Sequence, residues 1–207
     1  MKGGTVSTKE RREREKQQRK RTIIKAALEV LREDGFARIS MDKIAERAEL
    51  SKGALYLYFE NKEKLIIEIF WMLMEKLKKK IKDIISSDEK LELEEKLNKL
   101  IGMVLDFYSN EVEFFVFMNN ALIGLSSDMM QELKKTAVNF SIELNEIMEK
   151  LFEEYNQDRY KYSTLEMNIA FRGIIKNFLV EKFFGVYKQE KIRPEMLTDI
   201  FLRGVMK

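Results

Sequence analysis

The side chains with the clearest binding chemistry are hydroxyl, ammonium and phenol groups spaced between Ser40 and Lys62. Ser40 and Ser51 each precede a short stretch with helical apolar spacing, where a residue that caps a helix N-terminus stands. A capped N-terminus presents backbone N–H groups that bind phosphate, and a serine hydroxyl can donate to the same anion. Lys52 follows Ser51 and can reach a phosphate or a base edge. This spacing predicts a site that binds a polyanion.

The chain contains no His and no Cys. Their absence excludes Ser-His-Asp and Cys-His nucleophilic catalysis, thiol redox chemistry and zinc sites built from these residues. Carboxylates remain, but Glu92, Glu94, Glu95, Glu153 and Glu154 stand in charged helix faces, which is typical of solvated groups rather than of a glycosidase pair. We therefore expect no enzyme, no metal site and no cofactor.

The elements that position these residues are expected to be helices throughout. Apolar residues recur at spacings of three and four, and only nine Gly and one Pro interrupt 207 residues, which predicts an all-α fold. The expected helices, about nine in number, span residues 22–34, 41–48, 52–58, 61–85, 89–109, 111–125, 128–156, 163–188 and 195–206. Ser7 and Glu10 are spaced to start a helix that runs into 22–34; the alternative is a disordered N-terminal arm.

Helix length and charge both divide the chain. The expected helices are short up to about residue 60 and long afterwards, which predicts a head at residues 1–65 and a helical bundle at residues 66–207. Residues 1–25 hold ten basic and three acidic side chains, a local charge of +7 inside an overall +3, so the remainder carries −4. Such a concentration of positive charge beside short helices is typical of a nucleic-acid-binding surface.

Two of the short helices, 41–48 and 52–58, are joined by a tight turn, and helix 22–34 can support them as a helix-turn-helix. The pattern here is Ile44-Ala45-x-x-Ala48-x-x-Ser51-x-Gly53-x-x-Tyr56-x-x-Phe59-x-x-Lys62-x-x-Leu65, preceded by Gly35-Phe36 and Ser40. It resembles the DNA-binding head of the TetR family of transcriptional repressors. The likeness covers about residues 22–65; beyond them it extends only to length and helix number.

The expected DNA-binding residues are Ser40, Ser51, Lys52, Gly53, Ala54, Tyr56, Tyr58 and Lys62. Gly53 leaves room for close backbone approach, and Ala54 can contact a thymine methyl group. The resemblance implies that Tyr56 and Lys62 bind the phosphate backbone, a role that Tyr58 can share. The sequence departs from the family at Glu49, which stands where the family usually has glycine. Either Glu49 accepts an unusual backbone angle, or the turn has a slightly different shape.

The resemblance further implies that residues 66–207 sense a ligand and form a dimer. Soft apolar side chains suit an adaptable pocket, and a polar group among them must find a partner in the ligand, the bundle or the dimer. Taken singly, each apolar residue can equally be ordinary core. The candidate pocket comprises Trp71, Met74, Met103, Phe107, Phe117, Met118, Asn119, Phe140, Phe171, Arg172 and Ile175. The expected inducer is a small, largely apolar molecule that can carry an acid or an acyl chain.

Helices 163–188 and 195–206 are the expected dimer interface, because Leu197, Ile200, Phe201 and Val205 form an apolar stripe. A two-fold homodimer would bind double-stranded DNA at a palindromic operator and repress transcription. The alternative function is a helical membrane-surface or adaptor protein that uses the basic arm, which would not need the spacing of Ser51 and Tyr56.

The longest uncharged stretch, 114–127, has 14 residues, fewer than a membrane span needs. The N-terminus also lacks the apolar segment of a signal peptide, and we therefore expect a cytoplasmic protein.

Overall fold

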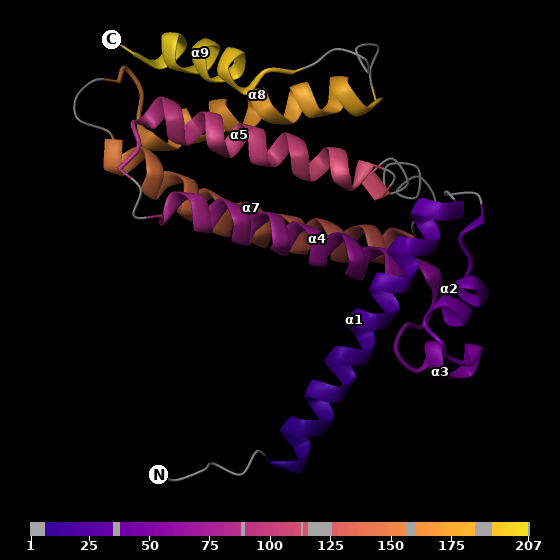
Figure 1. Cartoon of the computed structure of the whole chain (residues 1–207). Coiled ribbons are helices and arrows are strands. Elements are labelled where there is room, and N and C mark those ends of the chain that lie inside the picture. The colour runs from indigo at the N-terminus through magenta and orange to yellow at the C-terminus, as the bar shows by residue number, and fades with distance from the viewer. Residues whose placement is uncertain are drawn as a thin grey trace.

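The computed structural model of the chain is all-α, with a helical head attached to one end of a bundle of long helices (Figure 1). It describes residues 7–34, 38–87, 90–112, 114–115, 126–155, 160–184 and 192–206. The helices are α1 (Thr8–Asp34), α2 (Met41–Arg47), α3 (Lys52–Tyr56), α4 (Lys62–Ile85), α5 (Leu93–Asn110), α7 (Ser127–Tyr155), α8 (Thr164–Phe184) and α9 (Pro194–Val205). Most of the expected helix 111–125 lies outside the described residues. Among those described, no helix is both long and apolar enough to cross a membrane.

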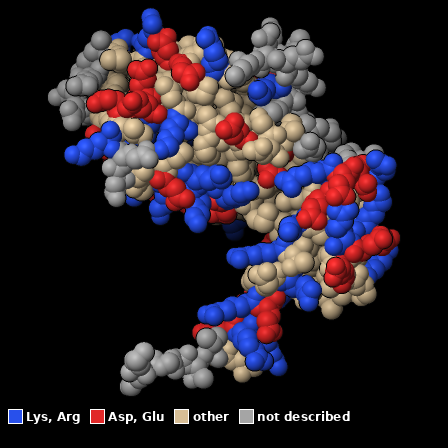
Figure 2. Space-filling model, viewed as in Figure 1, with Lys and Arg blue, Asp and Glu red and all other residues tan. Residues whose placement is uncertain are grey.

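The N-terminal segment is helical from Thr8, so the helical alternative for the basic arm is confirmed. Ser7 and Glu10 start α1 as a reciprocal pair: Ser7 N–H donates to the Glu10 carboxylate at 2.9 Å, and Glu10 N–H donates to Ser7 Oγ at 3.2 Å. The C-terminal half of α1, from Ile23 to Leu31, supplies the head core. Its first half extends away from the rest of the molecule (Figure 1), with Lys and Arg side chains along it (Figure 2).

Side-chain caps start the helices of the head. Ser40 Oγ accepts the N–H of Lys43 at 3.3 Å to begin α2, and Ser51 Oγ accepts the N–H of Ala54 at 3.1 Å to begin α3. The turn between them passes through Glu49, whose φ of 55° confirms the expected unusual backbone angle. The caps and the turn therefore direct the N-terminus of α3 away from the head core.

The bundle contains α4, α5, α7, α8 and α9, with α9 packed on α5 and α7 on both α4 and α8. α5 begins at Leu93, and the expected start near residue 89 was wrong. Glu92 and Glu95 cap each other's backbone at the true start, whereas Ser86 ends α4. An acid can therefore take the capping role that serine fills at the helices of the head.

The apolar stripe of α9 faces into its own chain. Leu197, Phe201 and Val205 are buried, and the Phe201 ring lies 5.1 Å from that of Phe171 in α8. Only Ile200 of the stripe stays exposed. The expectation that this stripe forms a dimer surface was therefore wrong for three of its four residues, because α5 and α8 already cover them.

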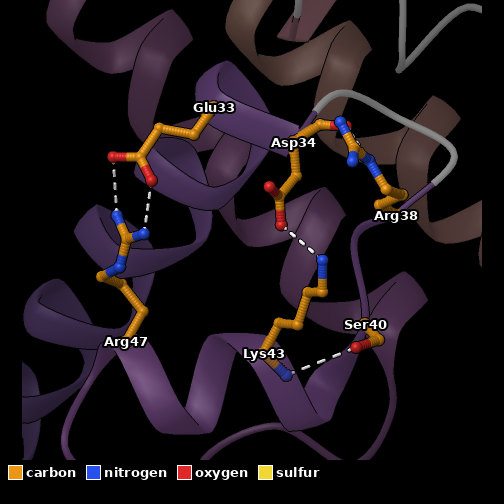
Figure 3. A network of polar contacts seen from close by, with 6 residues as sticks. All are labelled: Glu33, Asp34, Arg38, Ser40, Lys43 and Arg47. Atoms are coloured by element: carbon orange, nitrogen blue, oxygen red, sulfur yellow. Dashed lines mark hydrogen bonds and ion pairs between the residues drawn. The ribbon is translucent and has the colours of Figure 1, made fainter.

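Ion pairs fasten α2 to the end of α1 (Figure 3). Arg47 of α2 binds the Glu33 carboxylate through both terminal nitrogens, one at 2.9 Å. Lys43 Nζ binds Asp34 Oδ2 at 2.6 Å. The hydrogen bond from Arg47 lowers the pKa of Glu33 below its ordinary value of 4.5, and the bond from Lys43 lowers the pKa of Asp34 below 3.8. Both carboxylates are thus held in the charged form.

These pairs should make the stability of the head depend on pH. A lowered folded-state pKa means that the folded chain binds fewer protons, so the stabilisation is present above about pH 4.5 and is lost as pH falls through the folded-state pKa values. We expect the double substitution Glu33→Gln/Asp34→Asn to lower the Tm at pH 7 by no more than about 3 °C, because the pairs are exposed. The difference from the unsubstituted chain should shrink towards zero at pH 3.

Thermal unfolding followed by circular dichroism at pH 7, 5 and 3 would measure this effect. Glu146→Gln/Glu153→Gln is the matched control, because both side chains are exposed on α7 and neither makes an ion pair within the described ranges. A Tm difference that stays the same at all three pH values would contradict the assignment.

Candidate nucleic-acid interface

The first turn of α3 is presented to solvent while its middle is anchored in the head. Lys52 and Gly53 are exposed, Ala54 is half-buried, and Leu55 is completely buried. A Cβ atom placed on Gly53 would meet nothing within 4 Å, so packing inside the protomer gives no reason for glycine there. The space beside Gly53 is open to a large partner.

Ser51 and Lys52 form the exposed N-terminus of α3. The Ser51 oxygen accepts the Ala54 N–H, which leaves its O–H proton available to an anion. Lys52 Nζ lies 2.7 Å from Asp42 Oδ1 of α2. This hydrogen bond raises the pKa of Lys52, whose ammonium group therefore stays charged at neutral pH. A phosphate bound at this position would compete with the Asp42 carboxylate for the Lys52 ammonium group.

A basic groove lies between α1 and the end of α3. Arg12, Lys16 and Arg19 are spaced along one face of α1, and together with Leu57 and Tyr58 they line a groove of about 530 Å³ that also includes Glu15. Leu57 is 82 % exposed and Tyr58 is half-buried. The basic helix α1 and the two residues that directly follow α3 therefore contribute to one surface.

The other expected DNA-binding residues stand beside this surface in different surroundings. Tyr56 is 43 % exposed at the end of α3. Ser40 is half-buried as the cap of α2. Lys62 is half-buried as the first residue of α4, which Asn61 caps by accepting the Lys64 N–H at 2.8 Å. All eight expected residues thus belong to the head or its junction with α4.

The candidate pocket residues separate into several places. Trp71 of α4 and Phe140 of α7 have ring centroids 6.2 Å apart, and Met103 and Phe107 line a surface groove beside α4. Phe171 packs in an aromatic core cluster with Phe152 and Phe201. Met74 and Ile175 are buried, and Phe117, Met118 and Asn119 lie outside the described residues.

Arg172 is half-buried between α7 and α8. It donates to Asn145 Oδ1 and, at 3.1 Å, to Ser141 Oγ. Burial lowers the pKa of its guanidinium group, and it forms no ion pair with a carboxylate in the described part of the chain. The observed partners of Arg172, Asn145 and Ser141, thus both belong to the bundle.

Two interface residues were not predicted. Asp42 is ten positions from Lys52, and only the helix-turn-helix geometry brings them together. Leu57 follows Tyr56 as an apolar residue next to the expected recognition helix, and the sequence alone places it in the core as readily as on the surface. The solvent-exposed position of Leu57 emerges only once α3 is seen to end at Tyr56.

Comparison with known proteins agrees with this geometry. Residues 23–69 match the family of bacterial regulatory proteins called the tetR family. An HTH-type transcriptional regulator of Bacillus subtilis is 27 % identical over 125 residues, which cover 59 % of this chain and 64 % of the relative. The match thus spans less than two thirds of that relative.

Solved structures agree over more of the chain. A TetR-family transcriptional regulator from Mesorhizobium loti superposes with a TM-score of 0.73 at 17 % identity, covering 93 % of this chain and 98 % of its own. The regulator FadR from Bacillus subtilis, in complex with stearoyl-CoA, gives a TM-score of 0.63 at 22 % identity, covering 88 % and 95 %. The head thus matches the tetR family over residues 23–69, and the chain shares the fold of these TetR-family regulators.

Proposed function

We propose that the chain is a DNA-binding transcriptional repressor that acts as a homodimer on a palindromic operator and is released by a small, largely apolar ligand. The observation that carries the proposal is the solvent-exposed N-terminus of α3, formed by Ser51, Lys52 and Gly53, on a head in which the two residues just after α3 line a basic groove with α1. Exposed N–H groups and ammonium groups on a protruding helix suit the major groove and its flanking phosphates. Selection of bound duplexes from a random pool tests it, with a palindrome as the expected result.

The roles within this surface follow from the chemistry of each group. Ser51 and Lys52 bind phosphate or a base edge, and Ala54 contacts a thymine methyl group. Tyr56, Tyr58 and the α1 cations bind the backbone on the same side. Because binding to phosphates releases counterions, the α1 cations should set much of the salt dependence of binding.

Neutralising the groove face of α1 should weaken binding without unfolding the head. We expect Arg12→Gln/Lys16→Gln/Arg19→Gln to make the slope of log K against log salt less steep by about 0.9 for each phosphate that the protein no longer neutralises, hence by up to ~2.7. Fluorescence anisotropy on the selected duplex over a salt series measures this slope.

The control is Lys90→Gln/Lys150→Gln/Lys161→Gln, which removes the same charge from exposed positions outside the head, just before α5, in α7 and just before α8. This triple variant should keep the original slope. If the α1 variant kept the original slope, this result would contradict the proposal that these cations bind phosphates.

α8 supports the dimer part of the proposal, because it is apolar on opposite sides. Met167, Phe171 and Ile175 face the core, while Leu165, Ile169 and Val180 are exposed. α7 adds exposed Val138 and Ile142. Clustered exposed apolar residues mark interaction surfaces, and a second copy of α8 would cover this one symmetrically. Of the α9 stripe, Ile200 alone can join it.

A charge on this face should separate the subunits. We expect the unsubstituted chain to sediment as a dimer at micromolar concentration and Ile169→Glu, at a position that is 60 % exposed, to sediment as a monomer with unchanged helix content. Leu57→Glu is the control, because it puts the same charge at an exposed apolar position in the head. An unsubstituted chain that sediments as a monomer, or an Ile169→Glu dimer, would contradict the proposed interface.

The inducer is proposed to be an apolar, acyl-type molecule. The soft aromatic contacts between α4 and α7, around Trp71 and Phe140, can adapt to a chain-like ligand, and the FadR relative of similar fold is described in complex with stearoyl-CoA. α4 begins at the head and continues past Trp71, so a ligand that displaces α4 would move the head and lower operator affinity.

A further inference from the structure

A second groove lies between α4 and α5, apart from the aromatic contacts of Trp71 and Phe140. Its volume is about 520 Å³. Met103 and Phe107 of α5 give it an apolar wall, and Lys76 and Lys80 of α4 face Lys99 of α5 across it. Apolar surface combined with converging charged groups is the usual make-up of a small-molecule site.

The charge balance of the groove favours an anion. Among the residues that the structure describes, three lysines line it against two acids, Asp106 and Glu111. The Glu111 side chain is 8 % exposed and already has its own partners, since Arg32 binds it at 2.5 Å and Lys76 lies 3.8 Å away. With Glu111 neutralised by Arg32, the lysines outnumber the remaining acid.

A polar atom in the wall points to further ligand chemistry. The Oδ1 atom of Asn98 is buried and has no hydrogen-bond partner within the described chain. A buried acceptor is costly unless a donor reaches it. Asn98 lines this same groove, and its amide would have to rotate towards the groove before an N–H or O–H group of a bound molecule could reach that oxygen.

Glu111 also connects the groove to the head. Its partner Arg32 lies in the last turn of α1, directly before Glu33 and Asp34, which bind Arg47 and Lys43 of α2 (Figure 3). An anion that draws Lys76 away from Glu111 changes the balance of charge at Arg32. One turn of α1 therefore joins the groove to the helix-turn-helix.

We propose that the α4–α5 groove binds a diphosphate-bearing small molecule, with the diphosphate on Lys76, Lys80 and Lys99 and an apolar or planar group against Met103 and Phe107. Its occupancy is transmitted to the head through Glu111 and Arg32. The binding stands on the groove alone, whereas its effect on DNA rests on the proposed function.

Isothermal titration of the full chain tests the site, using inorganic pyrophosphate and coenzyme A as probes. Pyrophosphate carries the anion alone, and coenzyme A adds N–H donors and a planar group, so coenzyme A should bind more tightly. Lys80→Gln/Lys99→Gln should weaken both by about tenfold or more. The matched control Lys79→Gln/Lys82→Gln removes two exposed α4 charges outside the groove and should bind both probes normally.

Fluorescence anisotropy on the selected duplex tests the coupling. Coenzyme A should lower the operator affinity of the unsubstituted chain. Arg32→Gln should bind coenzyme A more weakly, because Glu111 is no longer neutralised, and should lose the response even at saturating coenzyme A. The proposed site is overturned if neither probe binds, or if Lys80→Gln/Lys99→Gln leaves the affinity for both probes unchanged. Binding with no effect on operator affinity overturns the coupling alone, and a chain that binds the probes but no DNA contradicts the proposed function and not the groove.

Discussion

The recognition surface depends on the burial of Leu55. α3 has five residues, far too few for a helix to persist in water by its own hydrogen bonds. Leu55 is completely buried and Phe59, just beyond the helix, is 3 % exposed. These two side chains hold α3 against the head while the Ser51 cap fixes its first turn. Without this anchor, the groups around Ser51 would have no defined direction.

The recognition surface also requires that a helix, and not a disordered arm, hold the basic side chains in place. Because α1 is continuous from Thr8 to Asp34, its apolar half fixes the direction of its basic half. Arg12, Lys16 and Arg19 then share a groove with Tyr58. The overall charge of +3 conceals this arrangement, since the excess is gathered in residues 1–25. α1 thus contributes both to the core of the head and to its basic surface. Through Arg32 it also contacts Glu111, at the end of α5.

Much of this could be predicted from the sequence, because local rules govern it. Periodicity located the helices, and the serine caps located α2 and α3. Of the two alternatives at Glu49, the φ of 55° confirms the unusual backbone angle. Features that depend on tertiary placement could not be predicted. The α9 stripe has the same pattern whether it faces α5 or a second copy. Likewise, the pairing of Lys52 with Asp42 depends on how α2 and α3 cross.

Hydroxyl-radical footprinting of the full chain on its selected duplex tests the central claim, that α3 and the basic face of α1 bind DNA as one surface. Two protected half-sites should appear, separated by whole helical turns. Each should have flanking backbone protection that disappears in the Arg12→Gln/Lys16→Gln/Arg19→Gln variant. Flanking protection that persists in this variant, or a duplex left uniformly unprotected, would contradict the account.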